Sequence, residues 1–145
     1  MVFQSSRSGV MALRRLLAVV ITAVSLLSIS LPAFADNDCT ATNTTEFANK
    51  IAYGHAFTKH SAEFMHGVSI SGLAFPDPTI ANEDAFATFL EGILGAPSNF
   101  KNLMNHRAAY WDARTGTVVI TNLAPVDCGT AFRPLMGKAY YDALN

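Results

Sequence analysis

The sequence predicts an α+β fold in which N-terminal helices pack on one face of a small antiparallel sheet of about four strands. Three observations favour this architecture. Helical patterns follow residue 44, β-branched strand patterns occupy the second half of the chain, and no repeat or linker divides residues 45–145. We therefore expect residues 45–145 to form a single domain, preceded by an N-terminal arm over residues 36–44.

Three segments have the pattern of helices. Residues 45–53 and 55–65 are expected to form two short helices that Gly54 separates, and the second places His60 on its apolar face. The clearest helix covers residues 83–94, because an asparagine N-cap precedes it, an apolar stripe runs along it and Gly-Ala-Pro ends it. These helices would supply the apolar layer that covers the sheet.

The second half of the chain carries the strand signals. Residues 108–112 and 117–122 flank a turn-length segment that ends in glycine, and the latter run is rich in valine and isoleucine. A third strand is expected over residues 129–133. Residues 68–75 form a short strand or loop, and the tail over residues 138–144 completes the domain.

The first 35 residues have the pattern of a secretory signal peptide. Arg14 and Arg15 precede an apolar run over residues 16–31, and Ala-Phe-Ala at residues 33–35 is a small-x-small cleavage site. The alternative is a membrane anchor, but the run is shorter than the roughly 20 residues that a spanning helix needs. We expect cleavage near Ala35, a secreted or periplasmic protein, and no membrane attachment afterwards.

The charge of the chain beyond the signal peptide limits its function. Cleavage removes three of the ten basic residues and none of the eleven acidic ones, so the mature net charge is −4 with neutral histidines. This excludes a broadly basic surface for nucleic acid. Any site for an anion must be local.

Two cysteines, Cys39 and Cys128, lie 89 positions apart. In an oxidising compartment a disulfide between them is the expected state, and two buried thiols or a reactive nucleophile are the alternatives. Loop-closure entropy assigns roughly 4 kcal/mol of stabilisation to such a bond. The bond would tether the arm of residues 36–44 to the segment around Cys128.

Three of the four histidines, His55, His60 and His66, fall within twelve residues. A metal site is one interpretation of this cluster. The spacings of five and six residues do not fit one face of a helix, and neither HExxH nor a Cys/His pairing is present. We therefore expect no metal and no other cofactor.

The segment of residues 54–64 combines two imidazoles, the ammonium of Lys59 and a carboxylate on one or two helical turns. Cleavage of a phosphodiester without metal needs a base for the ribose 2′-OH and positive charge beside the developing phosphorane. These residues suit that chemistry. The structural alternative is that His60 is a core histidine and Lys59 a solvated surface charge.

A second polar cluster lies on the third predicted strand, where Thr130 and Arg133 would occupy opposite faces of a regular strand. The hydroxyl of Thr130 could bond a phosphate oxygen or orient the base. The guanidinium of Arg133 could neutralise phosphate charge if the strand twists or ends near it. The structural alternative for Arg133 is an ion pair with Asp127 or Asp142.

Four short motifs occur in order along residues 54–141. They are Gly-His-Ala-Phe-x-Lys-His, Ala-Tyr-Trp-Asp-x-x-Thr-Gly-Thr-Val-Val-Ile, Gly-Thr-Ala-Phe-Arg-Pro and Gly-x-x-Tyr-Tyr. Together they resemble the C-terminal ribonuclease domains of bacterial polymorphic toxins, in the colicin D-like branch of the barnase–EndoU–colicin–RelE group. Two features depart from that family: the domain stands behind its own signal peptide, and Cys128 replaces a usual second glycine.

The resemblance implies helices followed by a four-stranded antiparallel sheet, and it implies a set of site residues. His60 and His55 become candidates for the general acid and base, and Lys59, Thr130 and Arg133 would face the scissile phosphate. Tyr110 and Tyr141 would stack a base or bond a phosphate.

The function that follows is a secreted, metal-independent endoribonuclease toxin, which cleaves RNA through the 2′-OH and leaves a 2′,3′-cyclic phosphate. Its partners would be an RNA substrate, with tRNA among the candidates, and a cognate immunity protein, and we expect a monomer. The alternative is a catalytically inactive secreted binding protein on the same scaffold. In that protein His60 would lie away from Thr130 and Arg133, with no cleft between them.

Overall fold

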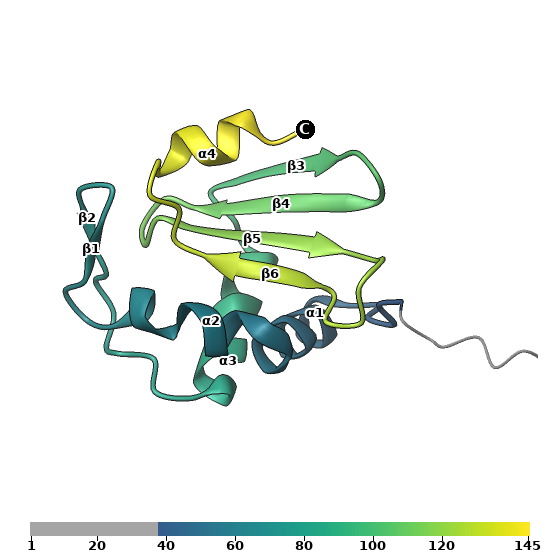
Figure 1. The fold of residues 1–145 in the computed structure, drawn as a ribbon, viewed down its shortest axis with the longest axis horizontal. Coiled ribbons are helices and arrows are strands. Elements are labelled where there is room, and N and C mark those ends of the chain that lie inside the picture. Colours follow the sequence, from purple (N-terminus) through teal and green to yellow (C-terminus); the bar gives the residue numbers. More distant parts are fainter. Residues whose placement is uncertain (1–37) are drawn as a thin grey trace, which may run out of the picture. The chain divides into compact units, whose positions relative to one another are not determined.

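A computed structural model describes residues 38–145 of the chain (Figure 1). The predicted signal peptide lies outside the described residues. Helices pack with a four-stranded antiparallel sheet, and a small two-stranded hairpin is added to them. The predicted α+β class is therefore confirmed.

The N-terminal layer is one continuous helical segment with four successive geometries. It comprises α1 (Thr44–Ile51), a π-helical turn (Ala52–Ala56), α2 (Phe57–His60) and a 3₁₀ turn (Ser61–Phe64). Asn43 caps α1, because its side chain accepts a hydrogen bond from the backbone N–H of Glu46. The prediction that Gly54 interrupts the helix is wrong: the turn widens at this point, and the chain remains helical.

The next helix, α3 (Glu83–Gly95), agrees with the predicted helix over residues 83–94. Asn82 begins it by accepting a hydrogen bond from the backbone N–H of Ala85. Its apolar stripe, which includes Phe86 and Leu90, is buried. The helix packs against α1 and against the main sheet.

The main sheet has the order β3-β4-β5-β6, and all neighbours are antiparallel. Its strands are β3 (Asn99–Leu103), β4 (Arg107–Asp112), β5 (Thr117–Asn122) and β6 (Gly129–Phe132). The last three match the predicted strands. The sequence does not predict β3, because Asn-Phe-Lys-Asn-Leu lacks the β-branched residues that mark strands.

The two faces of this sheet have different coverings. One face carries Val119 and Ala131 and packs on the buried side chains of the helical layer. On the other face a separate cluster around Trp111 and Val118 packs with Tyr141 of the short C-terminal helix α4 (Lys138–Ala143). Figure 1 shows α4 next to β3, whereas α1 and α2 lie on the β6 side.

The small hairpin consists of β1 (Ser69–Ile70) and β2 (Leu73–Ala74). Its turn residues, Ser71 and Gly72, both have positive φ, which makes the turn tight. The hairpin lies within residues 68–75, for which the sequence predicts a short strand or loop.

The predicted disulfide between Cys39 and Cys128 is present. The backbone N–H of Cys39 also donates to the carbonyl oxygen of Leu123 at 2.9 Å. The N-terminal arm is thereby tied to the loop that connects β5 to β6. Within residues 38–145, no helix has both the length and the apolar character needed to cross a membrane.

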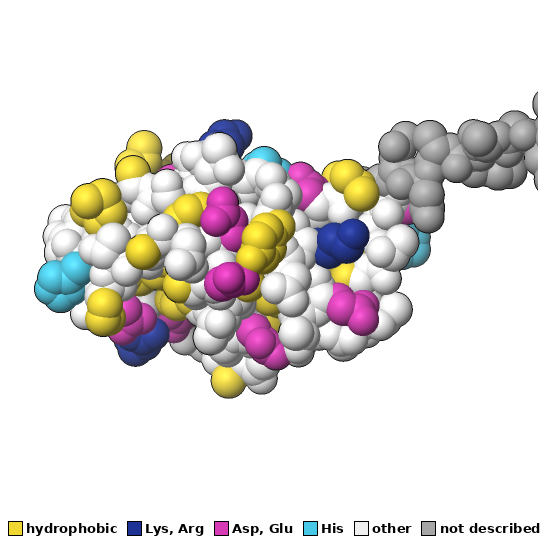
Figure 2. Space-filling view, turned by 90° about the horizontal axis from the view of Figure 1, so that it is seen from below, with side chains coloured by type: hydrophobic (Ala, Val, Ile, Leu, Met, Phe, Trp, Pro, Cys, Tyr) yellow, Lys and Arg dark blue, Asp and Glu magenta, His cyan; other side chains and the backbone are white. Residues whose placement is uncertain are grey.

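Figure 2 shows the molecule from the side of the helices. Acidic side chains are distributed over this face, and the basic side chains stand apart from one another. The basic side chains therefore form no continuous patch on this face.

Candidate active site

Side chains from three separate segments line one hollow of about 470 Å³. This volume is in the range of small-molecule sites. It lies between the helical segment, the loop before β6, and the part of the sheet that includes Ile120 and Thr130. Four predicted site residues meet here: His55, Lys59, His60 and Thr130. The remaining lining residues are Arg107, Ile120, Asn122, Pro125, Asp127, Gly129 and Phe132.

His55 lies in the π-helical turn and His60 ends α2, and both side chains line the same hollow. In a regular α-helix, residues five apart point in directions that differ by about 140°. The π geometry covers only Ala52–Ala56, and the α-helix resumes at Phe57. The two imidazoles share this hollow without sharing one helical face, because the hollow is lined by several segments. His66 lies elsewhere, with its Nδ1 3.0 Å from the carbonyl oxygen of Asp77.

The imidazole of His60 is held on two sides. Its Nδ1 lies 2.6 Å from Oε1 of Glu63, and its ring stacks on Phe132 with centroids 5.3 Å apart. The second carboxylate oxygen of Glu63 accepts a hydrogen bond of 2.6 Å from the backbone N–H of Arg133. Glu63 thus fixes the ring against the end of β6.

The imidazole of His55 has a carboxylate partner of its own. Its Nδ1 lies 2.5 Å from Oδ2 of Asp127, and the side chain remains 44% exposed. Asp127 can approach because Gly54 has no side chain: a Cβ there would lie 2.4 Å from the Cβ of Asp127. The backbone N–H of Gly129 also reaches Oδ1 of Asp127, at 3.5 Å.

The two histidine–carboxylate pairs orient their imidazoles in the same way. A carboxylate at Nδ1 accepts the Nδ1 proton, so that Nε2 of a neutral imidazole is a proton acceptor and Nε2 of an imidazolium is a donor. In the part of the chain that the structure describes, neither Nε2 has a hydrogen-bond partner. The hollow therefore contains two oriented groups that can transfer protons, one as base and one as acid.

Positive charge in the hollow comes from Lys59 and Arg107. Lys59 is exposed at the hollow, and no ion pair involves it among residues 38–145. The guanidinium of Arg107 is oriented by the carbonyl oxygens of Met104 and Asn145, each at 3.2 Å. With the hydroxyl of Thr130, these groups can bind and neutralise an anion.

Arg133 is not part of this hollow, and its expected role at the phosphate needs correction. It lies on the opposite face of β6 from Thr130, and only 2% of its surface is exposed. Burial lowers the pKa of the guanidinium below its ordinary value, an effect that Glu63 opposes. Neither predicted acidic partner, Asp127 or Asp142, pairs with it. Its donors instead bond the carbonyl oxygens of Thr115, Glu63, Val68 and Leu73 at 2.6–2.9 Å.

The two tyrosines expected to contact substrate also lie elsewhere. Tyr110 packs against the helical core, with its ring 5.0 Å from that of Phe100. Tyr141 is buried beside Trp111, and this burial raises the pKa of its phenol. Neither side chain lines the hollow.

Comparison with protein-family models, with curated proteins and with solved structures finds no match to this chain. The geometry of the hollow therefore carries the functional argument. Residues 38–145 contain no group of three or more histidine, cysteine or acidic side chains placed to hold a metal ion.

Several residues of the site are absent from the sequence-based prediction. Glu63 follows His60 by three positions, a spacing that brings side chains together on a helix. Phe132 follows Thr130 by two positions, so both share one face of a strand. The pairing of Glu63 with His60 and the shared strand face of Phe132 and Thr130 were therefore predictable from local patterns. The contributions of Asp127 and Arg107 depend on the tertiary fold, and no local signal marks them.

Proposed function

We propose that the protein is an exported, metal-independent endoribonuclease. It cleaves RNA by attack of a ribose 2′-oxygen on the adjacent phosphate and leaves a 2′,3′-cyclic phosphate. The observation that supports this proposal is the pair of imidazoles, His55 and His60, each held at Nδ1 by a carboxylate and both lining one hollow.

The reaction balances with these two groups alone. One imidazole takes the proton of the 2′-OH through Nε2 while the bond between the 2′-oxygen and phosphorus forms. The other, as imidazolium, gives its Nε2 proton to the 5′-oxygen while the bond between phosphorus and that oxygen breaks. Asp127 and Glu63 orient the rings and stabilise whichever ring carries charge.

Three further groups act on the phosphate. Lys59 and Arg107 supply positive charge for the non-bridging oxygens, whose charge increases in the phosphorane. The hydroxyl of Thr130 donates a hydrogen bond to one of them. This local set of cations lets a chain with an excess of acidic residues hold a segment of RNA backbone.

Export and the role as a toxin are parts of the same proposal. The disulfide supports an oxidising compartment, and the signal-peptide pattern of residues 1–35 supports secretion or a periplasmic location. The order of the motifs supports a toxin, with RNA as substrate, tRNA as one candidate, and a cognate immunity protein. We propose that it acts as a monomer.

The direct test is cleavage of total RNA by the protein purified with its disulfide intact, in the presence of EDTA. We expect fragments with 2′,3′-cyclic phosphate ends, identified by mass spectrometry. His55→Ala and His60→Ala should each lower the rate by about 100-fold or more, because each removes a proton-transfer group. His66→Ala is the matched control, since its imidazole lies outside the hollow, and it should retain native activity.

Two results would overturn the proposal. One is intact RNA at micromolar protein. The other is cleavage that persists in the His55→Ala/His60→Ala double variant, or on a strand whose 2′-OH groups are replaced by hydrogen.

The alternative, an inactive binding protein, requires His60 to lie away from both Thr130 and Arg133, with no cleft between them. His60 and Thr130 line the same hollow. Among the expected site residues of the helical segment and the β6 region, only Arg133 lies outside it. The arrangement favours the enzyme.

A further inference from the structure

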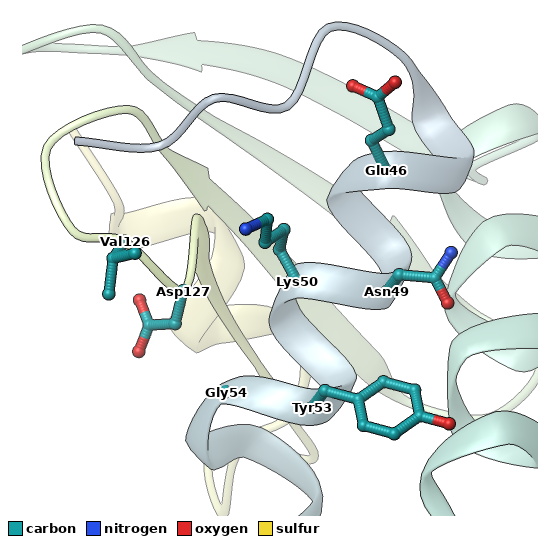
Figure 3. A pocket seen from close by; sticks show the side chains of 7 residues that line it. All are labelled: Glu46, Asn49, Lys50, Tyr53, Gly54, Val126 and Asp127. Atoms are coloured by element: carbon teal, nitrogen blue, oxygen red, sulfur yellow. The ribbon is translucent and has the colours of Figure 1, made fainter. Parts of the chain in front are cut away.

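A second hollow, of about 430 Å³, adjoins the first. Asp127 lines both, so the two meet at this side chain. Figure 3 shows the side chains that line it on α1 and the π turn, with the Val126–Asp127 segment beside them. The helical residues that line it are Glu46, Asn49, Lys50, Tyr53 and Gly54.

The hollow has a definite structural origin. Gly54 contributes no side chain, which leaves space next to the helix and lets Asp127 pack closely. The same glycine therefore shapes this hollow and positions the partner of His55. A strand that occupied the first hollow could pass over Asp127 into the second.

Apolar surface dominates the second hollow, and an aromatic ring borders it. Tyr53 is 58% exposed and Val126 is 56% exposed, so both present apolar surface to solvent at this hollow. The hydroxyl of Tyr53 donates a hydrogen bond to the carboxylate of Asp84, so its ring is held in place before any ligand binds. An exposed, oriented aromatic ring is a stacking platform for a nucleobase.

The polar groups of this hollow also suit a nucleotide. Lys50 extends toward the Val126–Asp127 segment (Figure 3), and its ammonium makes no ion pair within the described part of the chain. Asn49 offers an amide with donors and an acceptor for a base edge. The nearby carboxylate of Glu46 is already engaged by the backbone N–H and the hydroxyl of Thr42.

We infer that the second hollow is a subsite for the nucleotide next to the two that flank the scissile phosphate of the same RNA strand. The base packs against the ring of Tyr53, the next phosphate lies at Lys50, and the strand crosses Asp127 between the two hollows. This inference rests on the proposed ribonuclease function. It adds that the substrate is a strand of three or more nucleotides.

The test compares kcat/KM for oligoribonucleotides from two to six residues long. In the native protein we expect kcat/KM to rise with length by about fivefold or more, the lower end of what one stacked base provides. Tyr53→Ala should remove most of this length gain, whereas Tyr53→Phe, which keeps the ring, should retain most of it. Phe100→Ala is the matched aromatic control, because Phe100 is similarly exposed but lines neither hollow, and it should leave the gain unchanged.

Binding of 2′-deoxy strands, followed by fluorescence anisotropy, separates this inference from the proposed function, because such strands cannot form the cyclic phosphate. If RNA is cleaved but the gain is absent, or survives Tyr53→Ala, the subsite is wrong and the ribonuclease stands. If no RNA is cleaved, the ribonuclease is wrong. Anisotropy then decides the subsite: affinity that rises with length and falls in Tyr53→Ala retains it as a strand-binding groove, and any other result overturns it.

Discussion

Replacement of Gly54 by alanine should have two effects of opposite sign on the stability of the protein. Alanine is favoured over glycine within a helix by about 1 kcal/mol, so helix propensity alone predicts a more stable protein. The added methyl group, however, would lie 2.4 Å from the Cβ of Asp127. Carbon atoms pack at about 3.5–4.0 Å, so Asp127 and the turn must separate by about 1 Å.

This separation acts directly on the candidate site. The distance of 2.5 Å between Nδ1 of His55 and Oδ2 of Asp127 would reach the limit of a hydrogen bond after such a shift. We expect the cleavage rate of Gly54→Ala to fall by about 100-fold, as misplacement of a catalytic group by 1 Å can cause. Crowding costs about 1–3 kcal/mol, which the helix propensity offsets in part, so the melting temperature should fall by only a few degrees.

The assay is kcat/KM on a short oligoribonucleotide, together with the thermal unfolding midpoint. Gly92→Ala is the control, because Gly92 also lies in a helix, α3, and a Cβ there would meet no atom within 4 Å. It should gain stability and keep its activity. If Gly54→Ala behaves in the same way as Gly92→Ala, the argument that Gly54 positions Asp127 is refuted.

Three further predictions concern stability. Reduction of the Cys39–Cys128 bond should lower the free energy of unfolding by about 4 kcal/mol, and an unchanged urea midpoint under reductant would contradict this. Arg133→Met leaves four carbonyl oxygens without their donor and should cost about 3 kcal/mol or more, measured by urea unfolding. Hydrogen bonds from Thr42 lower the pKa of Glu46 in the folded state. The stabilisation of α1 by this carboxylate is therefore present above its unfolded-state pKa and lost as pH falls through the lowered one. Hydrogen exchange in α1 should follow that titration, and Glu46→Gln should abolish the dependence.

The parts of the fold that the sequence predicted are those with strong local signals. α3 has an N-cap, an apolar stripe and a Gly-Ala-Pro end, and the β4–β5 pair has β-branched runs on either side of a tight turn. β3 has neither signal. It is a strand because its backbone pairs with β4 from Asn99 to Leu103, and this pairing belongs to the tertiary fold.

The candidate site was predictable in part for a related reason. Residue chemistry together with the family resemblance identified His55, Lys59, His60 and Thr130, all of which line the hollow. The error at Arg133 arose because sequence chemistry could not distinguish a guanidinium at a phosphate from one that bonds carbonyl oxygens in the interior. Strand alternation favoured the interior, since it placed Arg133 on the face opposite Thr130.

The disulfide and the candidate site are linked through the backbone of residues 127–130. Cys128 and Gly129 have φ of 62° and 136°, and a Cβ on Gly129 would lie 2.0 Å from the carbonyl oxygen of Ile120, so the start of β6 lies too close to β5 for any side chain at this position. Asp127 precedes these two residues and Thr130 follows them, and the disulfide from Cys39 anchors Cys128. The bond that secures the N-terminal arm thus also limits how far Asp127 can move from His55. Formation of the disulfide would therefore restrain Asp127 as well as stabilise the fold.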